Sequence, residues 1–77
     1  MDLQAIRERI EREQKRGDIH LACRTAGSCT ASYRQTKDLN SLDEFTDPQL
    51  RIIKELLNIF DRRIEMKNSI LNHGYEN

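Results

Sequence analysis

The chain has 77 residues, of which 13 are Lys or Arg, 13 are Asp or Glu, 36% are hydrophobic and none is tryptophan. A chain of this length forms at most one domain, and its small apolar fraction limits the core that it can bury. We therefore expect a single domain over residues 1–77 and not an enzyme, because so thin a core leaves little room to enclose a substrate or a cofactor. No apolar stretch approaches the roughly 20 residues of a membrane span, and the N-terminal residues do not resemble a secretory signal. We expect a cytoplasmic protein whose two cysteines are reduced.

The formal charge is zero, but the charged residues are unevenly distributed. Residues 1–37 contain eight Lys/Arg and five Asp/Glu, whereas residues 38–47 contain four acids and no base. An acidic segment thus masks a mildly basic N-terminal half. A half of this kind would attract a polyanion such as a nucleic acid, although only modestly.

The first 17 residues predict a helix. Leu3, Ile6 and Ile10 recur at helical spacing among alternating acids and bases, which predicts a helix over residues 2–16. Gly17 follows where a helix often ends with a glycine in the left-handed conformation.

Residues 18–39 predict two more short helices separated by a tight turn. Asp18 is a suitable N-cap for a helix that ends at about residue 26. Gly27 then permits a left-handed turn that other residues resist. Thr30 is the expected cap of a third helix, over about 30–39.

The rest of the chain predicts an acidic linker and one long helix. Residues 40–47 form the linker, in which Leu42 and Phe45 are expected to reach the core. Thr46 precedes Gln49 by three residues, the spacing of a capping box, and Pro48 fits the first turn of a helix. That helix is expected over 48–71, followed by a polar tail over 72–77.

The long helix carries two apolar stripes, which lie about 120–140° apart when residues are placed at 100° intervals. One stripe contains Leu50, Ile53, Leu57, Phe60, Ile64 and Leu71. One stripe is expected to cover the core of the domain, and the other then needs another surface. We expect a second copy of the chain there; the alternative is that one monomer wraps both stripes. The expected dimerisation residues are Ile52, Leu56, Ile59, Arg63, Met66 and Ile70.

The segment around Gly27 resembles the helix-turn-helix of small bacterial and phage DNA-binding proteins. The resemblance covers about 20 residues and is carried by Leu21, Ala22, Cys23, Ala26, Gly27 and Tyr33. Ser28 and Cys29 stand where the family usually has an apolar residue and a capping serine or threonine. A turn one residue longer restores the pattern, with Cys29 directed inward and Thr30 as the cap. The resemblance implies an all-α fold whose third helix enters the major groove of DNA.

The residue types of the third helix fit that role. Arginine pairs with the O6/N7 edge of guanine and glutamine with adenine, while serine, threonine and lysine reach phosphates. The expected DNA-binding residues are Ser28, Thr30, Ala31, Ser32, Arg34, Gln35, Lys37 and Arg24. Further candidates for phosphate contacts are Arg7, Arg9, Arg12 and Arg16.

Metal binding and catalysis have weaker support. His20, Cys23 and Cys29 are spaced unlike the usual zinc ligands, with His73 as a distant fourth, so no metal is expected. A cysteine–histidine nucleophile pair would lack an orienting group and an oxyanion site.

The sequence thus predicts a small DNA-binding homodimer, such as a transcriptional regulator or an accessory factor of a mobile element. No membrane or small-molecule substrate is expected. The alternative is a helical protein-interaction module, an adaptor or an anti-regulator, that uses the long two-striped helix as its functional surface.

Overall fold

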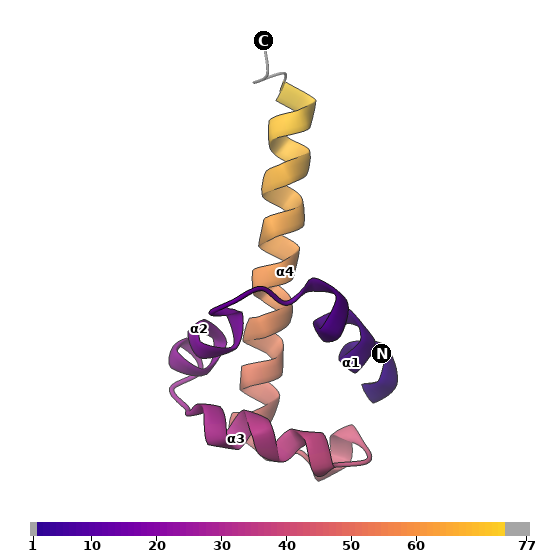
Figure 1. Cartoon of the computed structure of the whole chain (residues 1–77), viewed down its shortest axis with the longest axis vertical. Helices are drawn as coiled ribbons and strands as arrows, with labels where there is room; N and C mark the ends of the chain where they lie inside the picture. The colour runs from indigo at the N-terminus through magenta and orange to yellow at the C-terminus, as the bar shows by residue number, and fades with distance from the viewer. Residues whose placement is uncertain (1, 74–77) are drawn as a thin grey trace.

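The computed structural model describes residues 2–73, and this part of the chain is all-α (Figure 1). Three short helices pack around the first half of one long helix. The second half of that helix, residues 61–73, projects beyond them, and we call it the stalk. The elements are α1 (Leu3–Glu13), α2 (Asp18–Thr25), α3 (Thr30–Gln35), the 3₁₀ turns η1 (Thr36–Asp38) and η2 (Leu42–Glu44), and α4 (Asp47–His73). The predicted all-α fold with a long C-terminal helix is confirmed.

The core forms along one side of α4. Ile52, Leu56 and Phe60 are fully buried there. Ala22 and Cys23 of α2 are also buried, and their small side chains permit a close approach between α2 and α4. The remaining core side chains come from every other part of the domain: Leu3, Ile6, Ile10, Tyr33, Phe45 and Ile53.

The first helix is shorter than predicted. Asp2 caps α1 by accepting a hydrogen bond from the N–H of Ala5 (2.7 Å), but α1 ends at Glu13 and not at residue 16. Gln14 is extended, and the N–H of Lys15 donates to Asp18 Oδ2 (2.7 Å) instead of continuing the helix. Residues 14–17 therefore form a connection that crosses α4 (Figure 1).

Asp18 is not the exposed N-cap that the sequence predicts. Gly17, at φ +90°, occupies the cap position, and Asp18 is the first residue of α2 with its side chain buried. Its second oxygen accepts a hydrogen bond from Arg63 (2.8 Å), while Arg63 also donates to the carbonyl oxygen of Glu13 (3.4 Å). Arg63 thus fixes the α1–α2 connection to α4 at the point where the stalk begins.

The ion pair sets the protonation of Asp18. Burial by itself raises the pKa of this carboxyl group, but the hydrogen bonds from Arg63 and from the N–H of Lys15 outweigh it, so the net pKa lies below the usual value. The carboxylate is therefore charged in the folded chain at neutral pH, and it depends on Arg63 for a partner.

The start of α4 follows the predicted capping box. The N–H of Thr46 donates to Gln49 Oε1 (2.9 Å), and the N–H of Gln49 points to Thr46 Oγ1 (3.4 Å). In the preceding linker Phe45 is buried and Leu42 is half-buried, as expected. The helix continues to His73, so it takes in the first two residues of the predicted tail. Residues 74–77 of that tail lie outside the described part of the chain.

The predicted division of α4 into an inner and an outer stripe is wrong in its first half. Ile52 and Leu56, expected to face a second copy, are fully buried in the core of a single chain. The reason is that three short helices surround this half of α4 and use both stripes. Ile59 is half-buried, and Arg63 is committed to Asp18.

The stalk leaves large apolar side chains exposed. Met66 is 65% and Leu71 60% exposed, and Ile64 and Ile70 are close to half exposed. Only Met66 and Ile70 of the expected dimerisation residues therefore lie on an open apolar surface.

Among residues 2–73, no helix combines the length and the apolar character that crossing a bilayer requires.

Replacing Arg63 should destabilise the fold, because it leaves the charge of Asp18 buried without its partner. We expect Arg63→Ala to lower the free energy of unfolding by about 1–3 kcal/mol at pH 7 in urea titrations. Its exposed neighbour is the matched control: Arg62→Ala should change stability by less than about 0.5 kcal/mol.

The effect should also depend on pH. Because the pKa of Asp18 is lowered on folding, its contribution is present above the unfolded-state value of about 4 and is lost as the pH falls through the folded value. The difference between the wild type and Arg63→Ala should therefore shrink below about pH 4. Equal destabilisation by the Arg62 and Arg63 substitutions would contradict the assigned role.

Candidate nucleic-acid interface

The turn between α2 and α3 is a Schellman motif around Gly27. The N–H of Ser28 donates to the carbonyl oxygen of Cys23 (2.8 Å), and the N–H of Gly27 donates to that of Arg24 (3.1 Å). Gly27 has φ +70°, the left-handed conformation that the sequence predicts. These bonds end α2 and fix the direction in which the chain leaves it.

The residue that caps α3 is Cys29 and not Thr30. Cys29 has an extended backbone, its carbonyl oxygen accepts a hydrogen bond from the N–H of Ser32 (3.2 Å), and Thr30 is the first helical residue. Cys29 is also exposed, contrary to the expectation that it points inward, because Cys23 already occupies the buried position. The backbone N–H of Ser32 is the main cause that lowers the pKa of the Cys29 thiol, whereas burial raises the pKa of Cys23.

One side of α3 is held firmly against the domain. Tyr33 and Thr36 are buried, and Gln49 donates to the carbonyl oxygen of Ser32 (3.3 Å). The guanidinium group of Arg7 donates to the carbonyl oxygens of Thr36 (2.9 Å) and Leu39 (2.5 Å), so it caps the end of η1. These contacts fix the rotation of α3 about its axis.

The opposite side of α3 is open to solvent. Arg34, Gln35 and Lys37 are exposed, and none of the three side chains makes a hydrogen bond or an ion pair with any other residue between 2 and 73. Ala31 is exposed beside them. The structure thus brings Ala31, Arg34 and Gln35 together on the outward face of α3, and the exposed Lys37 follows on η1.

The remaining predicted DNA-binding residues lie at the edges of this face. Ser28, Thr30 and Ser32 are half-buried, and the carbonyl group of Ser32 is bonded to Gln49. Arg24 is exposed on α2. The third helix is shorter than predicted, because α3 ends at Gln35 and η1 replaces its last turn.

Two of the arginines suggested as phosphate contacts are committed elsewhere. Arg7 caps η1, as described above, and Arg9 bonds Glu13 (2.8 Å) and Asp61 (2.6 Å) while its guanidinium group lies 5.7 Å from the centre of the Phe60 ring. Arg12, Arg16 and Arg24 are exposed. Arg12 Nη2 lies 3.6 Å from Glu13 Oε2.

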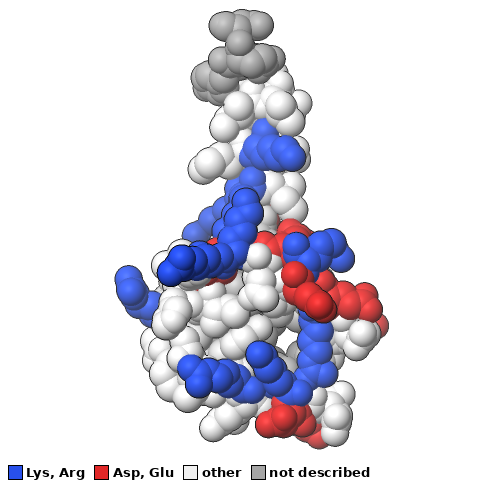
Figure 2. Space-filling view, in the orientation of Figure 1, with Lys and Arg blue, Asp and Glu red and all other residues white. Residues whose placement is uncertain are grey.

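Basic side chains cover much of the face drawn in Figure 2, with acidic side chains at its edges. Figure 2 shows Lys and Arg side chains across α3 and near the α1–α2 connection, whereas Asp and Glu side chains gather over α1 and beside η2. At the lower end of this view, acidic side chains lie directly next to the basic side chains of α3. A net charge of zero therefore conceals a basic face.

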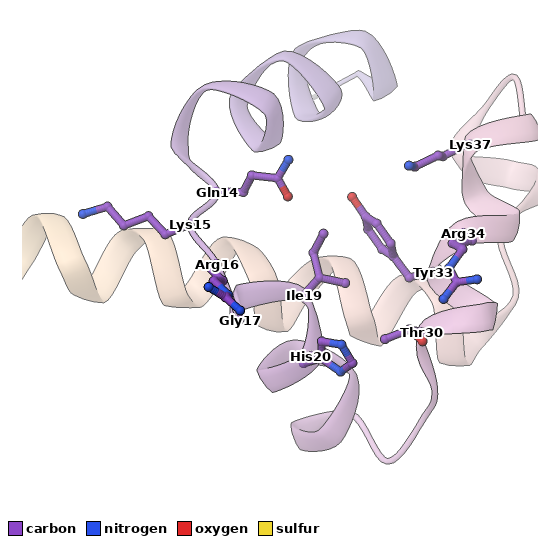
Figure 3. Close-up of a pocket in the computed structure, with 10 residues that line it drawn as sticks. All are labelled: Gln14, Lys15, Arg16, Gly17, Ile19, His20, Thr30, Tyr33, Arg34 and Lys37. Atoms are coloured by element: carbon purple, nitrogen blue, oxygen red, sulfur yellow. The ribbon is translucent and has the colours of Figure 1, made fainter.

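A cleft of about 440 Å³ separates the α1–α2 connection from α3 (Figure 3). Lys15, Arg16, Arg34, Lys37 and His20 contribute to its lining, and no acidic residue does. Other lining residues include Gln14, Ile19, Thr30 and Tyr33. The sequence gives no sign that the Tyr33 hydroxyl group and Gln14 share a cleft, because only the fold brings residue 14 opposite residue 33.

The described residues offer little for metal chemistry. Between residues 2 and 73 no three His, Cys, Asp or Glu side chains gather in a way that would hold a metal ion.

Comparison of the chain with protein-family models, with curated proteins and with solved structures finds no match. Its function must therefore be inferred from the exposure, contacts and charges of its own residues.

The Arg7 cap should be needed to hold the end of α3 and η1. We expect Arg7→Gln to lower the free energy of unfolding by about 1–2 kcal/mol, because three carbonyl groups lose a charged donor. Hydrogen exchange of the amides near residues 36–39 should accelerate more than that of α2. Arg12→Gln on the exposed side of the same helix is the control, and an equal effect of both substitutions would refute the assignment.

Proposed function

We propose that the chain binds duplex DNA, with the exposed face of α3 in the major groove. The observation that carries this proposal is the combination of a fixed inner side and an uncommitted outer side on the same short helix. Tyr33 and Arg7 hold the inner side. Arg34 and Gln35 lie on the outer side without intramolecular partners among residues 2–73. The inner contacts fix the backbone of α3 before binding, so only the exposed side chains have to be ordered when DNA binds.

The residue types divide into two roles. Arg34 suits the paired acceptors of guanine, Gln35 suits adenine, and Ala31 suits the methyl group of thymine. Lys37 and the hydroxyl groups at the edges of the face suit phosphates, which position a protein without selecting a sequence. A small regulator or mobile-element accessory factor acts in this way by occupying its site.

A homodimer is the second part of the proposal. Its interface is smaller than the sequence suggested. Its contact surface is the stalk alone, through Met66 and Ile70. Thirteen residues span about 20 Å, so a pair of stalks buries less than the roughly 800 Å² per partner of a standard interface. The stalk carries three bases and two acids in positions 61–67, so repulsion between copies is weak. We infer a weak dimer that two adjacent DNA half-sites stabilise.

The exposed stalk also favours the alternative function, a helical interaction module. A projecting helix with four open apolar side chains suits the groove of another protein. The two functions differ in what α3 does: in a module, its exposed basic face has no ligand.

Salt-titrated binding to a duplex of random sequence tests the DNA proposal. Lys37→Ala should weaken binding and reduce the slope of log affinity against log salt by about 0.9, the value for one lost phosphate contact. Lys54→Ala removes an exposed charge of α4 and serves as the matched control. No binding by the wild type at low salt, or equal slopes for all three proteins, would overturn the proposal.

Selection from a randomised duplex pool tests the base contact. Arg34→Ala should relax the preference at one guanine and cost about 1–3 kcal/mol on the selected sequence. An unaltered preference would remove Arg34 from the recognition surface.

Sedimentation tests the dimer. The wild type should associate at high micromolar concentration, and Met66→Glu with Ile70→Glu should abolish both association and cooperative binding to paired half-sites. Asn72→Glu adds a charge elsewhere on the stalk as a control. A wild type that stays monomeric at millimolar concentration and binds paired sites without cooperativity would exclude the homodimer and leave a different protein as the partner of the stalk.

A further inference from the structure

We propose that the cleft between the α1–α2 connection and α3 binds a phosphate group, with Tyr33, Gln14 and Lys37 as its donors. This cleft adjoins the outward face of α3, with which it shares Arg34, and it also contains Lys37 of η1. If the phosphate belongs to DNA, the inference rests on the proposed function. If it belongs to a free phosphorylated molecule, the inference stands alone.

The first argument is the state of Tyr33. Its residue surface is only 9% exposed, yet its hydroxyl group makes no hydrogen bond to another residue in the described range 2–73. In Figure 3 the hydroxyl oxygen points into the space between Gln14 and Lys37. A largely buried tyrosine usually has a partner for its hydroxyl group. No buried side-chain oxygen or nitrogen between residues 2 and 73 lacks a partner, so the Tyr33 hydroxyl oxygen lies at the open surface of the cleft, where a bound ligand can reach it.

The second argument is the charge of the lining. In Figure 3 the Lys37 side chain extends toward the Tyr33 hydroxyl group, and Arg16 lies at the rim beside Gly17. Lys15 extends away from the centre of the cleft. None of the residues that line this cleft is acidic. A cleft lined by several bases and no acid favours an anion over a cation or a neutral ligand.

The third argument is the set of donors. Tyr33 offers an O–H group, Gln14 an amide N–H and Lys37 an ammonium group, which together suit the several acceptor oxygens of a phosphate. Burial raises the pKa of Tyr33, so its hydroxyl group keeps its proton and donates at neutral pH. The volume of about 440 Å³ admits a phosphate together with part of what it is attached to.

The adjoining hollow limits where the phosphate sits. That space, of about 430 Å³, shares Gln14, Tyr33 and Lys37 with the cleft, but it is otherwise lined largely by apolar side chains and includes Glu11. Arg7 also lines this hollow, but its guanidinium group is bonded to the carbonyl oxygens of Thr36 and Leu39. The phosphate is therefore placed on the side of Arg16 and Arg34, away from the carboxylate of Glu11. This places it next to the face of α3 that the proposed function assigns to DNA.

Titration with inorganic pyrophosphate in phosphate-free buffer, followed by two-dimensional NMR of the full chain, tests the site. The wild type should show saturable shifts of the Gln14 side-chain amide and of amides near residues 33–37. Tyr33→Phe keeps the ring in the core and removes only the hydroxyl group, so it should weaken pyrophosphate binding about 2- to 10-fold. Lys37→Gln should weaken it as well, and Lys54→Gln should not.

A duplex DNA arm identifies the source of the phosphate. If it is DNA, a short duplex should compete with pyrophosphate, and Tyr33→Phe should weaken duplex binding by a similar factor on every sequence. If pyrophosphate binds but the duplex neither binds nor competes, the site takes a free phosphorylated molecule and the proposed function fails.

The opposite result would overturn the cleft alone. A duplex that binds the wild type and Tyr33→Phe equally and Lys37→Gln more weakly, with no pyrophosphate shift near Gln14, refutes the phosphate site and leaves DNA binding by α3 intact. Thermal unfolding of each variant ensures that a loss of binding is not a loss of fold.

Discussion

The position of Tyr33 in the core is the constraint on which the rest of the structure depends. Its ring packs from α3 into the cluster formed with α4, and this contact decides which side of α3 faces inward. The side chains on the other side, Arg34 and Gln35, are then exposed by geometry. The hydroxyl group of the same tyrosine reaches the cleft. One residue therefore orients the exposed face and contributes to the space behind it.

The domain uses few large side chains for this task. Ala22 and Cys23 allow α2 to lie close to α4, so the few large side chains of α4 are fully buried despite the low apolar content. Polar contacts also hold the elements in place: Arg7 caps η1, and Arg63 bonds Asp18 of α2 to α4. Arg7, which the sequence offers as a DNA contact, thus serves the fold. Among the bases that remain exposed are those of α3, η1 and the α1–α2 connection.

The stalk has a different character from the rest of the chain. Beyond Phe60 every described residue is exposed except Arg63, which is half-buried. An isolated helix of thirteen residues is of marginal stability in water, and this one gains little from packing. A partner that covers Met66 and Ile70 would stabilise it. In the proposed function this partner is the stalk of a second copy, which two adjacent DNA half-sites bring close.

Local patterns in the sequence predicted the elements that depend on local physics. The capping box at Thr46, the left-handed turn at Gly27 and the long last helix all follow from short-range rules, and the structure has them. The predictions for the end of α1, the environment of Asp18 and the direction of Cys29 were wrong. Each feature depends on a residue far along the chain or on which of the two cysteines occupies the buried position. The burial of Ile52 and Leu56 was missed for a similar reason: periodicity finds two stripes on a helix but not how many neighbours surround it. The cleft could not be predicted from the sequence, because residues 14 and 33 come close only in the folded chain.

The most direct test of the central claim is amide NMR of the full chain during titration with a short duplex DNA. The account predicts that shifts concentrate in residues 28–37 and in the α1–α2 connection, while the stalk changes only when two half-sites are present. Shifts confined to the stalk, or none at low salt, would contradict the claim that the exposed face of α3 is the binding surface.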